Sequence, residues 1–164
     1  MTFALMTWLF VVAVAAHNLE EAIWLPGWSQ LAGRWHPAVT AIEFRFAVVV
    51  LTAFAAATAA LANWQGKGSV GGYLVTGYAL AMLLNVIFPH ILATLALRRY
   101  TPGIVTAILA ILPATTGLIW SAFRENFVEL HRFLAVGPVL VIGILISIPL
   151  LFWLARKSGH SCWA

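Results

Sequence analysis

Five long apolar stretches constrain the fold of this chain more than any other feature of its sequence. They lie at about 2–25, 38–63, 70–97, 102–122 and 133–154. Each has the length of about 20 residues that a helix needs to cross the hydrocarbon core of a bilayer. Only 9% of the residues are charged, whereas a soluble domain carries about 25%. The sequence therefore predicts an all-α fold, an integral membrane bundle of about five transmembrane helices that forms a single domain over residues 1–164.

Proline and glycine residues mark the expected ends of these helices. Pro26 and Gly27 are expected to stop the first helix, and Pro37 to open the second. Thr101 and Pro102 have the residue types of a helix cap and a first helical position, so they are expected to begin the fourth. The first stretch contains small residues like those of a signal-peptide cleavage site, but no positive residue precedes it. We therefore expect an uncleaved first transmembrane helix.

The basic residues lie almost entirely at the edges of the apolar stretches, where cations contact lipid head groups. They form no patch or tail, so nucleic acid is excluded as a partner. One side of the bundle carries six and the other three, namely Arg34, Arg45, Arg98, Arg99, Arg156 and Lys157 against Lys67, Arg124 and Arg132. Because the more basic side faces the cytoplasm, we expect the N-terminus outside and the C-terminus in the cytoplasm. The expected setting is a bacterial inner membrane, with the lipid bilayer as partner.

Carboxylates are scarce and gather near the start of the chain. The sequence has no aspartate, and three of its five glutamates fall within the first 43 residues. In the motif His17-Asn18-Leu19-Glu20-Glu21, helical spacing places His17, Glu20 and Glu21 within an arc of about 100°. An ionisable group at membrane depth is costly unless it is paired, hydrated or bound to a cation. We interpret the motif as functional; the alternative is a packed polar network with solvated glutamates near the interface.

The second and third helices carry further candidates at the same level. Glu43 is either another ligand or the salt-bridge partner of Arg45 or Arg34. Asn85 and His90 would project about 140° apart on a regular helix. Proline at position 89 removes a backbone hydrogen bond and can rotate the following turn. Asn85 and His90 can therefore share one site with the first helix.

Three other regions with polar residues give weaker indications of a functional role. His36 is a candidate peripheral ligand, and His160 is expected to be inert. The charged segment 124–132 has nearly balanced signs, which is typical of a solvated face with local ion pairs. The single Cys162 allows no intramolecular disulfide and no thiolate cluster, so a metal site has to use nitrogen and oxygen ligands.

Imidazoles combined with carboxylates are the ligands of zinc, iron and manganese sites. The predicted ligands of one or two divalent ions, Fe or Zn, are His17, Glu20, Glu21, Glu43 and His90. Glu20 or Glu21 is expected to act as general base, and Asn85 to orient the substrate. One ion favours hydrolysis, and two irons favour oxygen chemistry. No serine elbow, cysteine nucleophile or phosphate-binding loop is recognisable in the sequence.

The order of these motifs resembles a known family. The motif at residues 17–21, followed by Asn85, Pro89-His90 and Tyr100-Thr101-Pro102-Gly103, is similar to the pattern of the HXXEE family of small multi-pass membrane proteins. The resemblance covers residues 17–103 and leaves the last two helices uncovered. It implies that His17, Glu20, Glu21, Asn85 and His90 act together, and it supplies no reaction.

Three hypotheses of function follow from the same residues. The first is a membrane-embedded metal-dependent enzyme whose site opens toward the cytoplasmic leaflet and acts on a lipid or other hydrophobic small molecule. The second is a transporter or ion-conducting bundle in which the glutamates and histidines relay protons or bind a cation. The third is an accessory membrane subunit whose polar residues only hold helices together. We favour the first because the His and Glu residues share one depth.

Overall fold

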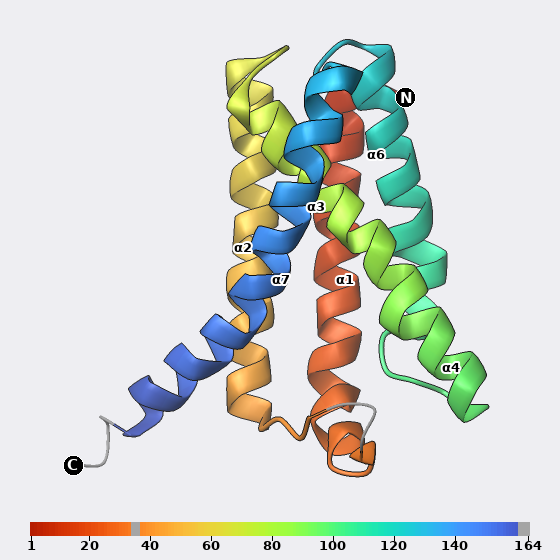
Figure 1. Ribbon diagram of the computed structural model, residues 1–164, viewed down its shortest axis with the longest axis vertical. Helices are drawn as coiled ribbons and strands as arrows, with labels where there is room; N and C mark the ends of the chain where they lie inside the picture. Colours follow the sequence, from red (N-terminus) through yellow and green to blue (C-terminus); the bar gives the residue numbers. More distant parts are fainter. Residues whose placement is uncertain (34–36, 161–164) are drawn as a thin grey trace.

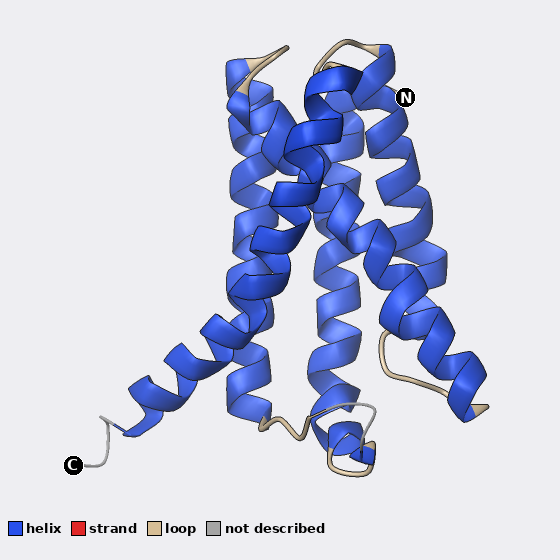
Figure 2. Ribbon diagram, viewed as in Figure 1, coloured by secondary structure: helices blue, strands red, loops and turns tan. Residues whose placement is uncertain are grey.

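A computed structural model of the chain describes residues 1–33 and 37–160, the last three of them by their backbone alone. All regular secondary structure in this part is helical (Figure 2), which confirms the predicted all-α class. The long helices are α1 (Phe3–Ser29), α2 (Ala41–Gln65), α3 (Val70–Asn85), α6 (Leu112–Arg124) and α7 (Leu130–His160). Shorter elements connect them: η2 (Val86–Ile91) and α4 (Leu92–Leu97) extend α3, and α5 (Ile104–Thr106) with η3 (Ala107–Ile111) leads into α6.

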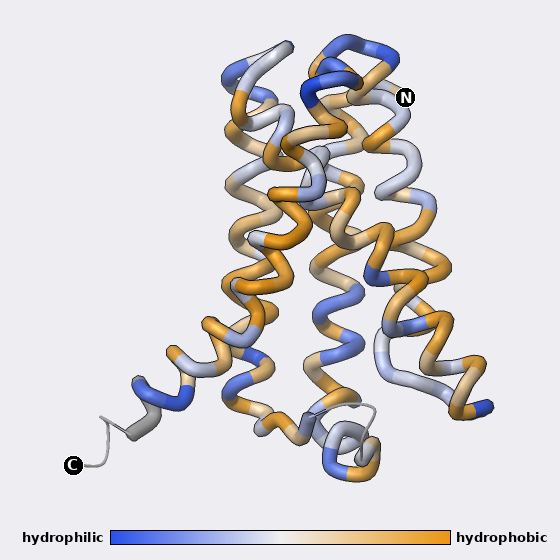
Figure 3. Tube along the Cα trace, viewed as in Figure 1, coloured by the Kyte–Doolittle hydropathy of each residue, from blue (hydrophilic) through white to orange (hydrophobic). Residues whose placement is uncertain are grey.

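Within the described residues, five helical segments are long and apolar enough to cross a membrane, as predicted. They are Phe3–Ser29, Ala41–Gln65, Val70–Leu97, Ile104–Arg124 and Leu130–Lys157. The two ends of the chain lie at opposite ends of the bundle (Figure 1), as an odd number of crossings requires. Apolar residues dominate the middle of the bundle, but hydrophilic segments interrupt α1 and the lower part of the α3–α4 helix (Figure 3). These interruptions mark the level of the candidate site.

Three predicted helix boundaries are wrong. The helix α1 continues through Pro26 to Ser29, because the Ala22 carbonyl that loses its helical N–H donor at Pro26 accepts a bond from Arg45 Nε at 3.4 Å. The start of α2 lies at Ala41 and not at Pro37. The fourth crossing starts at Ile104, and the residues expected to begin it form a loop that folds back toward α1.

The third crossing is interrupted where the sequence predicts an effect of proline. Phe88, which precedes Pro89, has extended backbone angles of φ −126° and ψ 119°. Proline disfavours the helical region for the residue before it. The chain resumes a helix as α4, and α3, η2 and α4 together form one bent membrane crossing (Figure 1).

The main core lies between α1, α2, α3 and α6. Its largest side chains are Phe3, Phe10, Tyr78, Ile111 and Leu118, each at most 1% exposed. The helix α7 crosses α3 closely at Gly77, where a Cβ atom would lie 2.4 Å from Leu140 Cδ1. Beyond this crossing α7 diverges from α3 toward its C-terminal end (Figure 1), and only 11% of its apolar window is buried. The C-terminal part of α7 therefore packs less closely against the bundle than the other crossings do.

Candidate metal centre

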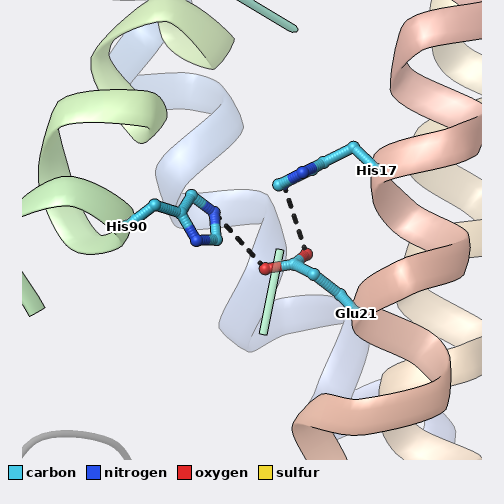
Figure 4. A group of neighbouring side chains, drawn as sticks. All are labelled: His17, Glu21 and His90. Atoms are coloured by element: carbon cyan, nitrogen blue, oxygen red, sulfur yellow. Dashed lines mark ion pairs between the residues drawn. The ribbon is translucent and has the colours of Figure 1, made fainter. Parts of the chain in front are cut away.

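Three of the five predicted ligands converge inside the bundle (Figure 4). His17 Nε2 lies 3.7 Å from Glu21 Oε2, and His90 Nε2 lies 3.5 Å from Glu21 Oε1. One donor atom from each residue lies within 4.8 Å of the other two. The two imidazoles are 1% and 2% exposed and the carboxylate 14%, so the cluster is shielded from solvent. We call His17, Glu21 and His90 the triad.

Local geometry explains how distant residues form the triad. His17 and Glu21 are four residues apart on α1, so they lie on the same face of that helix. The interruption at Phe88 turns His90 back toward Asn85, whose Nδ2 lies 3.0 Å from His90 Nε2 and 3.5 Å from His17 Nε2. Asn85 thus contacts both imidazoles, as the sequence predicts.

The loop before α5 closes the back of the triad. Gly103 has a left-handed φ of +88°, which favours glycine. A Cβ atom there would lie 2.6 Å from His90 Cε1, 2.9 Å from His17 Cε1 and 3.0 Å from Glu21 Cγ. Gly103 is therefore required both by the backbone conformation and by the space behind the three side chains.

Glu20 faces the loop rather than the triad, unlike its predicted role as a ligand or base. Its Oε1 accepts bonds from the Gly103 N–H at 3.1 Å and the Tyr100 hydroxyl at 2.5 Å. Its Oε2 accepts bonds from the Thr106 N–H at 2.9 Å and the Thr106 hydroxyl at 2.5 Å. Adjacent helical residues project about 100° apart, so Glu21 reaches His90 while Glu20 anchors residues 100–106.

Tyr100 lies outside the membrane-crossing helices, and its contact with the Glu20 carboxylate affects the pKa of its phenol. Partial burial and the hydrogen bond to the Glu20 carboxylate raise the pKa of the Tyr100 phenol to about 12. Both effects disfavour the tyrosinate, because a second negative charge would face the carboxylate. Tyr100 therefore stays a hydrogen-bond donor at neutral pH.

The Glu20 contacts determine which nitrogen of His17 carries a proton. The Thr106 hydroxyl has one hydrogen, and its contact with Glu20 Oε2 at 2.5 Å is shorter than its contact with the Gly103 carbonyl at 3.3 Å, so the hydrogen is assigned to the Glu20 bond. Its oxygen then accepts from His17 Nδ1, which lies 3.0 Å away. His17 Nε2 is left with a lone pair that faces Glu21. The other imidazole is held similarly, since the His90 ring bonds the Pro102 backbone.

The triad is rich in acceptors. The lone pair of His17 Nε2 and both Glu21 oxygens converge. The Asn85 amide lies 3.0 Å from His90 Nε2 and 3.5 Å from His17 Nε2, and an ion bound at these nitrogens would replace both contacts. Acceptor atoms at such distances repel unless a proton or cation lies between them. Two imidazoles and a carboxylate are the donor set of catalytic zinc and of non-haem iron(II) sites. The residues present therefore fit a divalent ion.

The structure does not bring Glu43 to the triad. Its Oε2 accepts from the Thr40 N–H at 3.0 Å in a capping box, and its Oε1 pairs with Arg156 Nε at 3.4 Å. The capping box holds Glu43 in the first turn of α2, whereas Glu21 lies about 12 Å inside the end of α1. The predicted role of Glu43 as a ligand is therefore not supported, and its ion-pair partner is Arg156 rather than Arg45.

The remaining candidates lie elsewhere. Glu129 pairs with His131 at 3.4 Å and with Arg132 at 3.0 Å near the opposite end of the bundle, as predicted for a face with local ion pairs. The predictions for Arg34, His36 and Cys162 fall outside the described residues, as does the side chain of His160.

Sequence reasoning missed the role of the loop residues. Tyr100 and Gly103 entered only as part of a family resemblance, and Thr106 was not singled out. A threonine in an apolar helix usually bonds its own backbone, as Thr115 does with the Ile111 carbonyl at 2.7 Å. Only the fold distinguishes Thr106 from such residues.

Comparisons with known proteins identify a family and one relative. A family described as "Protein of unknown function with HXXEE motif" matches residues 8–118, a range that contains the triad, Asn85 and the loop. The "Uncharacterized protein YrkK" of Bacillus subtilis (strain 168) is 35% identical over 148 residues, which cover 90% of this chain and 94% of that protein. No solved structure matches this chain.

Proposed function

This chain belongs to the family of proteins with the HXXEE motif, whose function is unknown, so we propose a function from the geometry of the site. We propose that it is a membrane-embedded metal-dependent enzyme in which His17, Glu21 and His90 hold one divalent ion, zinc or iron(II), and that it acts on a hydrophobic substrate. The observation that carries this proposal is the convergence of three buried donor atoms within 4.8 Å of one another.

The distances fit a single ion. Nitrogen and oxygen ligands of tetrahedral zinc lie about 2.0–2.1 Å from the metal and therefore about 3.3 Å from each other. His17 Nε2 and His90 Nε2 lie 3.7 Å and 3.5 Å from different oxygens of Glu21, and one donor atom from each residue lies within 4.8 Å of the other two. Binding one ion through a single Glu21 oxygen therefore requires these side chains to move closer by up to about 1.5 Å. A second ion lacks ligands among these residues, because Glu20 and Glu43 are engaged elsewhere. One ion with three protein ligands favours the hydrolytic interpretation over di-iron oxygen chemistry.

The surrounding residues have distinct roles in such a site. A bound ion with three protein ligands supplies a Lewis acid that keeps an open coordination position. Asn85 contacts both imidazoles and is able to orient a polar group of the substrate. Glu21 presents two oxygens, so the one that does not bind the ion is able to hold a proton. Glu20 is a positioning residue that acts on His17 through Thr106.

The orientation belongs to the same proposal. Glu21 and His90 lie in the half of the bundle where α1 ends at Ser29 and α4 ends beside Arg98, and Arg156 and Lys157 lie near the end of α7 on the same side. The positive-inside rule assigns this end to the cytoplasm. We therefore propose a bacterial inner-membrane protein with its N-terminus outside and its site facing the cytoplasmic leaflet.

Elemental analysis of detergent-purified protein tests the proposal. We expect about one zinc or iron per chain in the wild type and essentially none in Glu21→Gln, because the amide keeps the shape but loses the charged ligand. Glu43→Gln is the matched control, since Glu43 is also a partly buried glutamate in a membrane helix and pairs with Arg156. A metal-free wild type, or equal metal in Glu21→Gln, contradicts the enzyme hypothesis. Ion or proton flux in sealed vesicles would support a transporter instead.

The positioning role of Glu20 and Thr106 gives a second expected result. Thr106→Val removes the acceptor of the His17 Nδ1 proton, so we expect the metal affinity to fall about 10–100-fold, as for other groups that orient a ligand. Thr106→Ser restores the hydroxyl and should recover the affinity. Thr115→Val is the control, because the Thr115 hydroxyl bonds only its own helix in the described structure. Competition with a metal-binding dye measures each affinity, and nitrogen NMR shifts of His17 report its tautomer; an unchanged Thr106→Val contradicts the role.

A further inference from the structure

Three adjoining cavities run along the side of α7 that faces α2 and α3. The lowest, of about 280 Å³, contacts Glu21, Asn85 and His90. The middle one, of about 90 Å³, shares Glu21, Asn85, Ile148 and Phe152 with the lowest. The highest, of about 460 Å³, shares Leu51 and Ile144 with the middle one. The shared residues place the three cavities in one row along α7, and we call this row the α7 groove.

The α7 groove starts at the triad and extends toward the middle of the membrane. Its wall on α7 spans Phe152 to Val139, which corresponds to about 20 Å of helix. The groove thus has the length of a membrane lipid's tail rather than of a compact metabolite.

The polar groups that a ligand can reach lie at the lower end. Above the triad, the Tyr78 hydroxyl donates to the Leu51 carbonyl at 3.1 Å, and the Ser147 hydroxyl donates to the Ile144 carbonyl at 2.7 Å. Their hydrogens are engaged within the protein, and the other residues lining the highest cavity are apolar or glycine. A matching ligand therefore has a polar end at the triad and an apolar remainder.

The middle cavity restricts the shape of that remainder. Tyr78, Met82 and Ile144 line it, and its volume of about 90 Å³ is far smaller than that of the cavities on either side. A single hydrocarbon chain needs less room in so small a cavity than a fused ring system such as a sterol, so the volume favours a chain. The cavity above widens again and offers room for the end of the chain.

We propose that the substrate is a lipid with a long unbranched acyl chain, whose polar end lies at the triad and whose tail lies in the α7 groove. This inference rests on the proposed function, because it names the substrate class of the same site. The chain enters from the bilayer, since α7 is the least buried of the five crossings and diverges from α3 beside the groove (Figure 1).

Gly143 provides a variant that shortens the groove. It lines the highest cavity, and a Cβ atom built on it meets nothing within 4 Å. Gly143→Leu therefore fills the far end of the groove without displacing backbone. Gly27→Leu is the matched control, because Gly27 is also a helical glycine with nothing within 4 Å and lies outside the groove.

Photocrosslinking in detergent tests the proposal with a palmitate and an octanoate that carry a diazirine at the chain end. We expect palmitate to label the walls of the highest cavity in the wild type and in Gly27→Leu. Gly143→Leu should reduce this labelling at least about tenfold, the effect of a misfit methylene or more in an apolar pocket. Octanoate should label the lower cavities equally in all three proteins. A phosphatidylcholine that carries the same photoreactive chain distinguishes a phospholipid source from a free fatty acid.

Glu21→Gln separates this proposal from the metal proposal, because it removes a ligand and leaves the apolar walls intact. Metal-free Glu21→Gln should therefore still be labelled by palmitate in the highest cavity. If the wild type itself holds no metal but is labelled there, the enzyme hypothesis fails and the acyl-chain groove stands. If metal is present but labelling is spread evenly over the lipid-facing sides of the helices, or is unchanged in Gly143→Leu, the acyl-chain proposal is overturned.

Discussion

Gly103→Ala should abolish tight metal binding although no metal ligand is altered. The new methyl group would lie 2.6 Å from His90 Cε1 and 2.9 Å from His17 Cε1. Both rings would have to move apart, and the backbone would also have to accept a left-handed φ of +88° with a side chain present. We expect the metal affinity to fall at least about 100-fold, because the methyl group would prevent the two imidazoles from closing to the metal–nitrogen distance of about 2.0 Å.

Gly68→Ala separates the two effects of this substitution. Gly68 has a similar φ of +69°, but a Cβ atom there meets nothing within 4 Å. Each variant should lose about 1–2 kcal/mol of stability from the backbone conformation. Only Gly103→Ala should lose the metal, measured as metal per chain after equilibration with a buffered concentration of zinc. If both variants retain metal, the loop does not shape the triad.

The membrane crossings could be predicted because hydropathy and length are local properties. The number of crossings follows from hydropathy and length, and the pairing of His17 with Glu21 follows from the helical repeat. The helix boundaries were predicted less accurately from the sequence, because they depend on tertiary contacts. Helix α1 passes through Pro26, and Arg45 from another helix bonds the Ala22 carbonyl that lacks its helical donor there. No local pattern encodes this contact.

The predictions for the candidate site were also partly right and partly wrong. Asn85 and His90 could be expected to meet because a proline lies between them, and they do contact each other at 3.0 Å. Glu43 was expected near the triad because it is a carboxylate at the same end of the bundle. A threonine at position 40 makes it a capping residue, and this competing local signal was available in the sequence.

The contribution of residues 100–106 required the fold. Gly103 is explained by a φ of +88° and by its proximity to three side chains of α1 and η2. Thr106 bridges His17 and Glu20 across a sequence separation of more than 80 residues. The α7 groove likewise depends on where α7 crosses α3. Each of these features is a relation between segments, so residue types and spacing alone cannot reveal it.

The wild-type protein should be stabilised strongly by the metal that it binds. A ligand that binds only the folded state stabilises it by about 4 kcal/mol when its free concentration is 1,000 times the dissociation constant. The stabilisation then grows by about 1.4 kcal/mol for each further tenfold increase in free metal. His90→Gln removes one of the three ligands but retains a polar group of similar reach, so we expect its unfolding temperature to be nearly independent of the metal.

Thermal unfolding in detergent, followed across a series of buffered zinc or iron(II) concentrations, measures this difference. His131→Gln is the matched control, because His131 is 76% exposed and pairs with Glu129 away from the triad; it should respond to metal as the wild type does. If the triad only holds helices together, His90→Gln would be less stable than the wild type by the same amount at every metal concentration. A wild type whose unfolding temperature ignores both added metal and a chelator would therefore identify the triad as helix-packing contacts and remove the basis for a metalloenzyme.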